Sequence, residues 1–200
     1  MSLAELICPA GTPAALRIAV DAGADSVYCG FQNATNARNF PGLNFTAEEL
    51  LDAVVYAHTR GAKVLLALNT YPPAGQVNLW RQAADIGARL RVDAFIVADM
   101  GVADYISHTY PGVRLHLSVQ AAASSPEAIR YYCKSFGVKR VVLPRILTIP
   151  EVRQIRKEIP CEIETFIFGN HGLMVEGQCS LTNYLTGQST NMDGVCSPAS

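Results

Sequence analysis

Two of the six cysteines, Cys179 and Cys196, stand in a polar stretch rich in Gly, Ser, Thr and Asn, where core packing does not explain a thiol. Cys8, Cys29, Cys133 and Cys161 lie in or beside apolar runs and are interpreted as inert core side chains. Thiolates bind metals, and His171 and Glu176 share the stretch with Cys179. Zinc or an iron–sulfur cluster usually takes about four ligands, and no CxxC pair is present, so further ligands must come from elsewhere.

A second group of polar residues closes four apolar, strand-like runs. The group consists of Asn69, Thr70, Asp99, Ser118, Gln120 and Arg145. In parallel α/β barrels the carboxyl ends of the strands and the loops after them carry the binding groups, so these side chains are expected to face one mouth. Asn, Asp and Ser also cap helices, and this alternative fits Asp99 before Gly101. Gln120 and Arg145 are not favoured caps, and with Asn69 they are interpreted as substrate-binding residues.

The stretch 30–45, GFQNATNARNFPGLNF, is long for a connection between a strand and a helix and contains a single cation, Arg38. Long loops at the mouth of a barrel often carry binding function. The guanidinium of Arg38 suits a carboxylate or phosphate, so Arg38 joins the expected substrate-binding residues. The alternative is that the Asn side chains only satisfy turns of the loop itself.

The elements that must position these residues follow a regular order. Short apolar runs alternate with longer amphipathic segments, which is typical of parallel βα units rather than hairpins. The expected strands are 6–8, 26–29, 63–68, 94–98, 114–119, 140–143 and 162–168. The expected helices are 12–22, 46–61, 77–90, 102–109, 126–136 and 149–158. Thr46 and Glu49 have the spacing of a capping box, and Ser125 and Gly137 flank the fifth helix.

Seven units of this kind favour an α/β fold with a parallel, TIM-like (β/α) barrel, of which seven of eight βα units are visible. The first turn, CPAGTPAAL, lacks the GxGxxG pattern of a doubly wound sheet. A complete barrel takes about 250 residues, so the sequence is interpreted as truncated. Residues 1–200 are expected to form one barrel domain, in which 169–200 is the cysteine-bearing loop after strand seven.

Composition narrows the class of protein. Half of the residues are hydrophobic, and the formal net charge of -1 comes without any run of like charges. A nucleic-acid partner is therefore not expected. No apolar run approaches the roughly 18 residues of a membrane span, and the start MSLAELICPAG lacks the features of a signal peptide, so a cytoplasmic protein with reduced cysteines is expected.

Several motifs together resemble the collagenase-like peptidase family over essentially the whole chain. They are ICPAG at 7–11, TNARNFPGLNFT at 35–46, LSVQAAAS at 117–124, VVLPRIL at 141–147 and MVEGQCSLTNYLTG at 174–187. TNARNFPGLNF and the stretch GVCSPAS at 194–200 are most similar to the UbiU branch of that family. The resemblance implies a barrel that acts with a UbiV-like homologous subunit in oxygen-independent hydroxylation of a small aromatic, quinone-precursor ring during ubiquinone biosynthesis.

The resemblance also implies a 4Fe-4S cluster held by four cysteines. Cys179 and Cys196 fill two of these positions, and the family's layout places the fourth beyond residue 200. Gly172 occupies the third position, seven residues before Cys179. His171, next to it, is a candidate replacement ligand, because imidazole takes the place of cysteine in some clusters.

Four hypotheses about function follow. The first is a subunit of an oxygen-independent hydroxylase. By analogy with the family, the oxygen donor would be prephenate, which carries carboxylates. The second is a peptidase, for which His171 with Cys179 is the only conceivable dyad, because the other histidines fall in helix or strand patterns. The third is hydroxylation of RNA, which other members of the family perform and which the charge disfavours. The fourth is a cluster-free subunit that binds a partner barrel.

Overall fold

The structure is a computed structural model that describes residues 4–169, 174, 176–177 and 179–194. Seven parallel strands form one sheet in chain order, each hydrogen-bonded to the next. They are β1 (Ile7–Pro9), β2 (Ser26–Gly30), β3 (Lys63–Leu68), β4 (Ala94–Val97), β5 (Arg114–Leu117), β6 (Arg140–Val142) and β7 (Glu162–Glu164). This order confirms the predicted parallel TIM-like fold.

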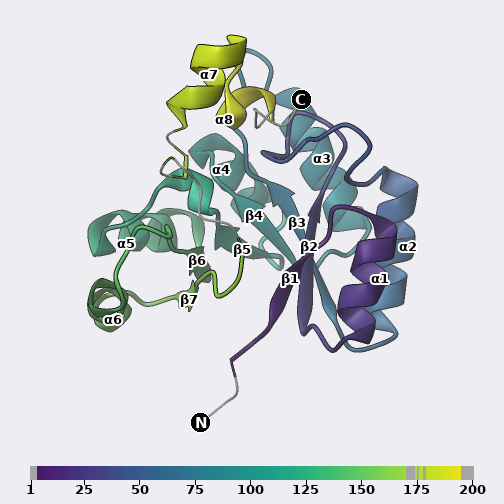
Figure 1. Ribbon diagram of the computed structural model, residues 1–200, viewed down its shortest axis with the longest axis horizontal. Helices are drawn as coiled ribbons and strands as arrows, with labels where there is room; N and C mark the ends of the chain where they lie inside the picture. The colour runs from purple at the N-terminus through teal and green to yellow at the C-terminus, as the bar shows by residue number, and fades with distance from the viewer. Residues whose placement is uncertain (1–3, 170–173, 175, 178, 195–200) are drawn as a thin grey trace.

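Helices connect the strands and cover the outer face of the curved sheet (Figure 1). Along the chain they are α1 (Pro13–Asp21), α2 (Ala47–His58), α3 (Asn78–Arg89), α4 (Met100–Thr109), the 3-10 turn η1 (Val119–Ala121), α5 (Pro126–Phe136) and α6 (Ile149–Glu158). Two short helices follow β7, namely α7 (Ser180–Thr186) and α8 (Thr190–Asp193). Both lie at the end of the barrel where the strands have their carboxyl ends (Figure 1).

Local sequence signals set the helix ends as predicted. The Thr46 side chain accepts from the backbone N–H of Glu49 at 3.2 Å, and the Glu49 carboxylate accepts from the backbone N–H of Thr46 at 2.9 Å, so the capping box is formed. Ser125 caps α5, and Gly137 ends it with φ 68°, a left-handed conformation that favours glycine. These caps satisfy backbone groups that would otherwise have no partner.

Two apolar clusters occupy opposite faces of the sheet. Alternate residues such as Val64 and Leu66 pack with the helices in the larger cluster, whereas Leu65, between them, belongs to a small cluster with Ala94 and Ile96. The alternation follows from the period of two along a strand. The smaller cluster therefore marks the inner wall of the barrel.

Two predicted elements need correction. The strand expected at 162–168 ends at Glu164. The last hydrogen bond between the two strands runs from Leu143 N–H to the Glu164 carbonyl at 3.0 Å, and the neighbouring segment then turns, with Leu147 N–H donating to the Pro144 carbonyl at 3.3 Å. The strand expected at 114–119 ends at Leu117, because Ser118 caps η1. The segment 169–200, predicted as a loop, contains α7 and α8.

In the part of the chain that the structure describes, no helix combines the length and the apolar character that a membrane span requires.

Candidate functional site

The carboxyl ends of the strands and the segments after them form one surface, which we call the mouth. Two backbone hydrogen bonds fix the segment that carries α8 against it. Asn39 N–H, in the long loop after β2, donates to the Gly194 carbonyl at 2.9 Å, and Tyr71 N–H, after β3, donates to the Asn191 carbonyl at 2.6 Å. The mouth therefore brings together residues from both halves of the chain.

Asn69 joins the mouth to the loop after β2. Its side-chain oxygen accepts from Ala37 N–H at 2.9 Å, its amide group donates to the Ser118 hydroxyl at 3.5 Å, and its backbone N–H donates to the Thr35 carbonyl at 2.9 Å. Its carboxamide is thus engaged at both ends. The geometry gives Asn69 a positioning role at the mouth, and its predicted contact with substrate stays a prediction.

Three hydrogen bonds within the loop after β2 hold the backbone of Arg38. Asn36 accepts from Arg38 N–H at 3.0 Å and donates to Asn44 at 2.8 Å, and Asn44 in turn donates to the Arg38 carbonyl at 2.8 Å. The interpretation that these Asn side chains satisfy turns of their own loop is therefore confirmed for Asn36 and Asn44. The bonds also fix the point from which Arg38 projects.

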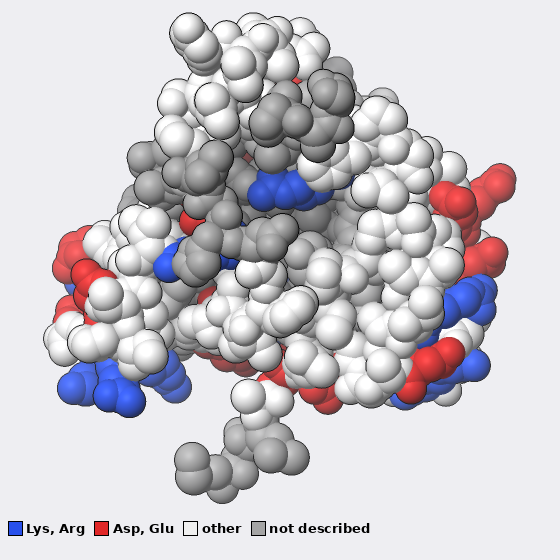
Figure 2. All heavy atoms as spheres, in the orientation of Figure 1, with Lys and Arg blue, Asp and Glu red and all other residues white. Residues whose placement is uncertain are grey.

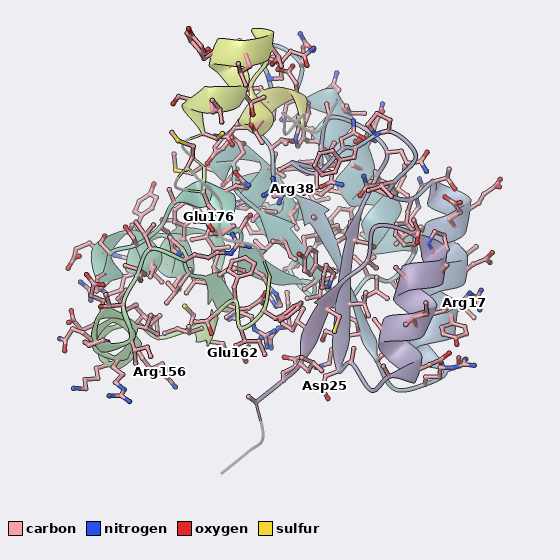
Figure 3. All side chains as sticks on the ribbon, in the orientation of Figure 1. Arg17, Asp25, Arg38, Arg156, Glu162 and Glu176 are labelled. Atoms are coloured by element: carbon pink, nitrogen blue, oxygen red, sulfur yellow. The ribbon has the colours of Figure 1, made fainter. Side chains whose placement is uncertain are left out.

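The guanidinium of Arg38 is exposed at the mouth near α8 (Figure 3). It donates to the adjacent Ala37 carbonyl at 3.2 Å, and no carboxylate among the described residues pairs with it. A guanidinium held in place without a counter-ion is suited to bind an anion such as a carboxylate.

Arg145, after β6, is held differently. It forms an ion pair with Glu176, whose side chain is 8% exposed, and its guanidinium carbon lies 3.6 Å from the centre of the Phe166 ring. The pair joins the end of β6 to the segment before α7 (Figure 3 labels Glu176). Since the charge of Arg145 is already balanced, Arg38 is the better candidate for an incoming anion.

Gln120, in η1, is only 5% exposed. Its carbonyl accepts from the Tyr71 hydroxyl at 3.1 Å, but its side-chain Oε1 is buried without a hydrogen-bond partner in the described part of the chain. Leaving such an atom unpaired costs about 1–3 kcal/mol. A hydrogen-bond donor on a bound ligand would remove that cost.

Gly177 packs directly on Gln120. Its φ is +78°, and a Cβ at this position would lie 2.4 Å from the Gln120 carbonyl oxygen, a distance that real Cβ atoms do not show. Only glycine fits there. Its close contact with Gln120 places Glu176, the partner of Arg145, beside η1.

Cys179 immediately precedes α7. Its sulfur lies 3.8 Å from the Thr182 hydroxyl, and a hydrogen bond from the Thr182 backbone N–H stabilises the thiolate and lowers the pKa of Cys179. The thiol is therefore chemically suited to bind metal. The other predicted ligands, His171 and Cys196, lie outside the described residues, and so does Gly172.

Of the three ligands predicted for a metal centre, the described residues include Cys179. Among the residues that have been placed, no group of three or more His, Cys, Asp or Glu side chains is arranged to hold a metal ion. Cys179 is the one described thiolate of the predicted set, and one thiolate does not hold a four-iron cluster. The predicted cluster stays a prediction.

The three described histidines do not form a hydrolytic dyad at the mouth. His58, on α2, pairs with Asp93 at 2.8 Å, and His108, on α4, lies 3.3 Å from Asp104. His116 lies within β5 and is 2% exposed. Their predicted placement in helices and a strand is confirmed.

The inner wall of the barrel contains polar residues that the sequence interpretation missed. Burial raises the pKa of Tyr28 and of Glu164, and it lowers the pKa of His116 to about 4. The charges of Arg38 and Arg145 act in the opposite direction on Tyr28, so this phenol lies within electrostatic range of both arginines. Polar residues that alternate with packed apolar ones along β5 and β7 were the available sequence signal.

Comparison with known proteins places these features in a family. Residues 11–199 match the model of Peptidase family U32. The chain is 33% identical to an uncharacterized protease of Methanocaldococcus jannaschii, over 99% of this chain and 48% of that protein. It is also 33% identical to tRNA hydroxylation protein P1 of Bacillus subtilis, over 96% of this chain and 45% of that protein. A solved U32 peptidase superimposes with a TM-score of 0.70 at 22% identity, covering 82% of this chain and 69% of the other.

The names of further relatives fall into the same two groups, proteases and RNA hydroxylation proteins. The chain spans about half the length, or less, of the curated relatives that it matches. The solved structure supports the barrel, and the family model covers nearly the whole chain. The motif resemblance is thereby confirmed, and the chain belongs to peptidase family U32.

Proposed function

We propose that this chain is part of an oxygen-independent hydroxylation protein in which Arg38 binds a carboxylate-bearing reactant at the mouth of the barrel. Relatives named for hydroxylation of tRNA and rRNA support the type of reaction. The observation that carries the proposal is the exposed guanidinium of Arg38, whose backbone is fixed by Asn36 and Asn44 and whose charge is unbalanced among the described residues.

The proposed substrate is a small aromatic ring, a quinone precursor in ubiquinone biosynthesis, with a UbiV-like homologue as partner. The motifs at 35–45 and 194–200 support this choice, because they are most similar to the UbiU branch. Charge supports it as well. On the face shown in Figure 2, the described Lys and Arg side chains form separate groups rather than one continuous band, whereas RNA binding favours a basic stripe.

Hydroxylation of RNA is the second candidate, and the names of the relatives are the specific observation that favours it. Because the chain covers 45% of the B. subtilis relative, the charge of residues 1–200 does not represent a whole protein of that kind. A basic surface contributed by other segments would make RNA binding compatible with this barrel.

A 4Fe-4S cluster is the proposed cofactor, with Cys179 and Cys196 as ligands and His171 as the candidate replacement at the position that Gly172 leaves without a thiol. Such a cluster transfers single electrons when it is bound. The lowered pKa of Cys179 supports its role as a ligand. The residues of this chain contribute by binding and orienting the reactants at the mouth.

The test is deletion of the gene from the source organism, growth without oxygen, and mass spectrometry of quinones and of nucleosides from total RNA. Loss of ubiquinone with accumulation of a less hydroxylated precursor would support the first candidate. Loss of a hydroxylated nucleoside would support the second. Unchanged quinones and nucleosides, together with casein cleavage by the purified complete protein, would replace hydroxylation with the peptidase function.

A further inference from the structure

A groove opens where the carboxyl ends of β6 and β7 separate, on the side of the molecule away from α1 and α2 (Figure 1). The last hydrogen bond between the two strands joins Leu143 N–H to the Glu164 carbonyl, and the segment after β6 then turns, with Leu147 N–H bonded to the Pro144 carbonyl. The segment 165–169, after β7, also lines the groove. Between these segments and α6 lies a cavity of about 500 Å³, and small-molecule sites typically measure about 300–1,000 Å³.

Apolar side chains form most of the lining of this groove, and several of them are exposed to water. They include Leu143, Leu147, Ile149, Val152, Phe166 and Phe168. Ile149 is 70% exposed and Phe168 is 98% exposed. A single exposed apolar side chain is ordinary, but several around one cavity are typical of a binding site. A bound apolar molecule would remove their surface from water, which favours binding.

Two of the lining side chains are aromatic. Phe166 and Phe168 both follow β7, and both border the cavity. Aromatic rings pack on one another in offset or edge-to-face arrangements, which add to the gain from burial. The lining therefore favours a ligand with an aromatic ring over one that is purely aliphatic.

Arg145 also lines the groove and supplies hydrogen-bond donors to it. Its Nη1 donates to Glu176, and its guanidinium carbon lies 3.6 Å from the centre of the Phe166 ring, so two contacts hold the guanidinium in place. Nε and Nη2 carry further N–H groups, for which the described residues provide no hydrogen-bond partner. The side chain is 25% exposed, so water has only partial access to these donors. A ligand with an acceptor oxygen would satisfy them.

The charge balance of Arg145 favours an uncharged ligand. Glu176, which is 8% exposed, already neutralises the guanidinium. A second carboxylate would lose its hydration among apolar side chains without an unbalanced cation to compensate for the loss. Arg153 borders the groove as well, but it is exposed on α6, where solvent screens its charge. The acceptor is therefore expected to be a neutral oxygen, such as that of a carbonyl group.

We propose that this groove binds an uncharged aromatic molecule whose carbonyl oxygen accepts a hydrogen bond from Nε or Nη2 of Arg145. The ring packs among the aromatic and aliphatic side chains of the lining. The groove is joined to the mouth through Glu176, the partner of Arg145, which Figure 3 labels. The inference goes beyond the proposed function, because the lining of the groove does not include Arg38 and binding there does not require hydroxylation.

The first test uses benzophenone, an uncharged molecule with a carbonyl group between two rings, which attaches covalently to nearby C–H groups under ultraviolet light. The complete protein, purified without oxygen, is irradiated with this probe, and the labelled peptides are identified by mass spectrometry. We expect the label in 143–153 and 165–169. Labelling spread evenly over exposed apolar side chains elsewhere, such as Tyr184 on α7, would overturn the proposal.

Competition with small molecules tests the contact with Arg145. Acetophenone and ethylbenzene differ by the carbonyl oxygen, and each is added as a competitor of the probe. The double variant Arg145→Met, Glu176→Gln removes the donors without leaving a buried charge unpaired. It should weaken competition by acetophenone about fivefold relative to ethylbenzene, the effect of one hydrogen bond. An unchanged ratio in a variant that circular dichroism shows to be folded would refute this contact.

Charge is tested with benzoate, which has the shape of acetophenone and a carboxylate in place of the ketone. Benzoate should compete at least about fivefold less well than acetophenone, because its charge would be desolvated. Arg153→Gln should leave labelling by benzophenone unchanged. Competition by benzoate equal to that of acetophenone, or loss of labelling in Arg153→Gln, would show an anion site that involves Arg153 and would refute the uncharged ligand.

A matched pair of variants tests the apolar lining. Ile149, in the groove, and Ile18, on α1, are both 70% exposed, so replacing either with serine should leave the fold intact. Ile149→Ser should raise the benzophenone concentration needed for half-maximal labelling of the groove about threefold, since it removes part of the apolar surface. Ile18→Ser should leave it unchanged. Equal effects of the two substitutions would contradict binding in the groove.

Discussion

Gly177→Ala should destabilise the protein more than an alanine substitution at a left-handed glycine that has open space around it, because Gly177 packs against Gln120. The φ of Gly177 is +78°, and a left-handed conformation costs an L-residue roughly 1–2 kcal/mol. The added Cβ would also lie 2.4 Å from the Gln120 carbonyl oxygen. Because that oxygen belongs to the backbone, rotation of a side chain cannot relieve the overlap, and overpacking adds about 1–3 kcal/mol.

Gly75 provides the matched control. Its φ is +80°, and nothing lies within 4 Å of a Cβ built on it, so Gly75→Ala isolates the backbone cost. We expect Gly75→Ala to lower the free energy of unfolding by about 1–2 kcal/mol and Gly177→Ala to lower it by about 2–5 kcal/mol in urea titrations.

Hydrogen exchange shows which segment Gly177→Ala destabilises. If the segment 176–194 lifts from the mouth before the barrel unfolds, its amides should exchange faster in Gly177→Ala, while those of β3 and β4 keep their protection. Equal destabilisation by the two substitutions, with unchanged exchange in 176–194, would show that the close approach of Gly177 to Gln120 does not exist.

Three further predictions concern the helix cap, the buried histidine and the thiol. Thr46→Ala should lower the free energy of unfolding by about 1 kcal/mol, because it removes the acceptor for Glu49 N–H, and urea titration measures this. The pKa of His116 is lowered to about 4, so its contribution is complete above pH ~6.5 and should be lost, up to about 3 kcal/mol, as the pH falls toward 4. His116→Gln should remove that part of the pH dependence, and an identical profile would contradict it. Iodoacetamide at pH 7 should alkylate Cys179 well before Cys161, whose pKa burial raises to about 12, and peptide mass spectrometry reads the order.

The fold was largely predictable because its signals are local. Alternation between β-branched runs and amphipathic segments predicted all seven strands, and the cap residues Thr46 and Ser125 predicted helix starts to within a residue. The end of β7 was mispredicted, because its apolar continuation 165–168 has no neighbouring strand to pair with, since the adjacent segment turns at 144–147.

The candidate site was predictable only in its residue types. Arg38 and Arg145 were both expected at the mouth, but nothing local distinguishes a free guanidinium from one paired with Glu176, 31 residues away. The inward position of Glu164 was missed for a similar reason. A charged residue in a short strand is normally predicted to face solvent. The side of the sheet that Glu164 faces is set by the register between β7 and β6, which the local sequence does not specify.

The most direct test of the account is complementation of the deletion strain without oxygen, with the hydroxylated product measured by mass spectrometry. Wild-type protein should restore the product, and so should Arg153→Gln, which removes an exposed arginine on α6. Arg38→Gln at the same protein level should restore less than about a tenth of it, since the carboxylate would lose its charge-assisted hydrogen bonds. Full restoration by Arg38→Gln would contradict the account.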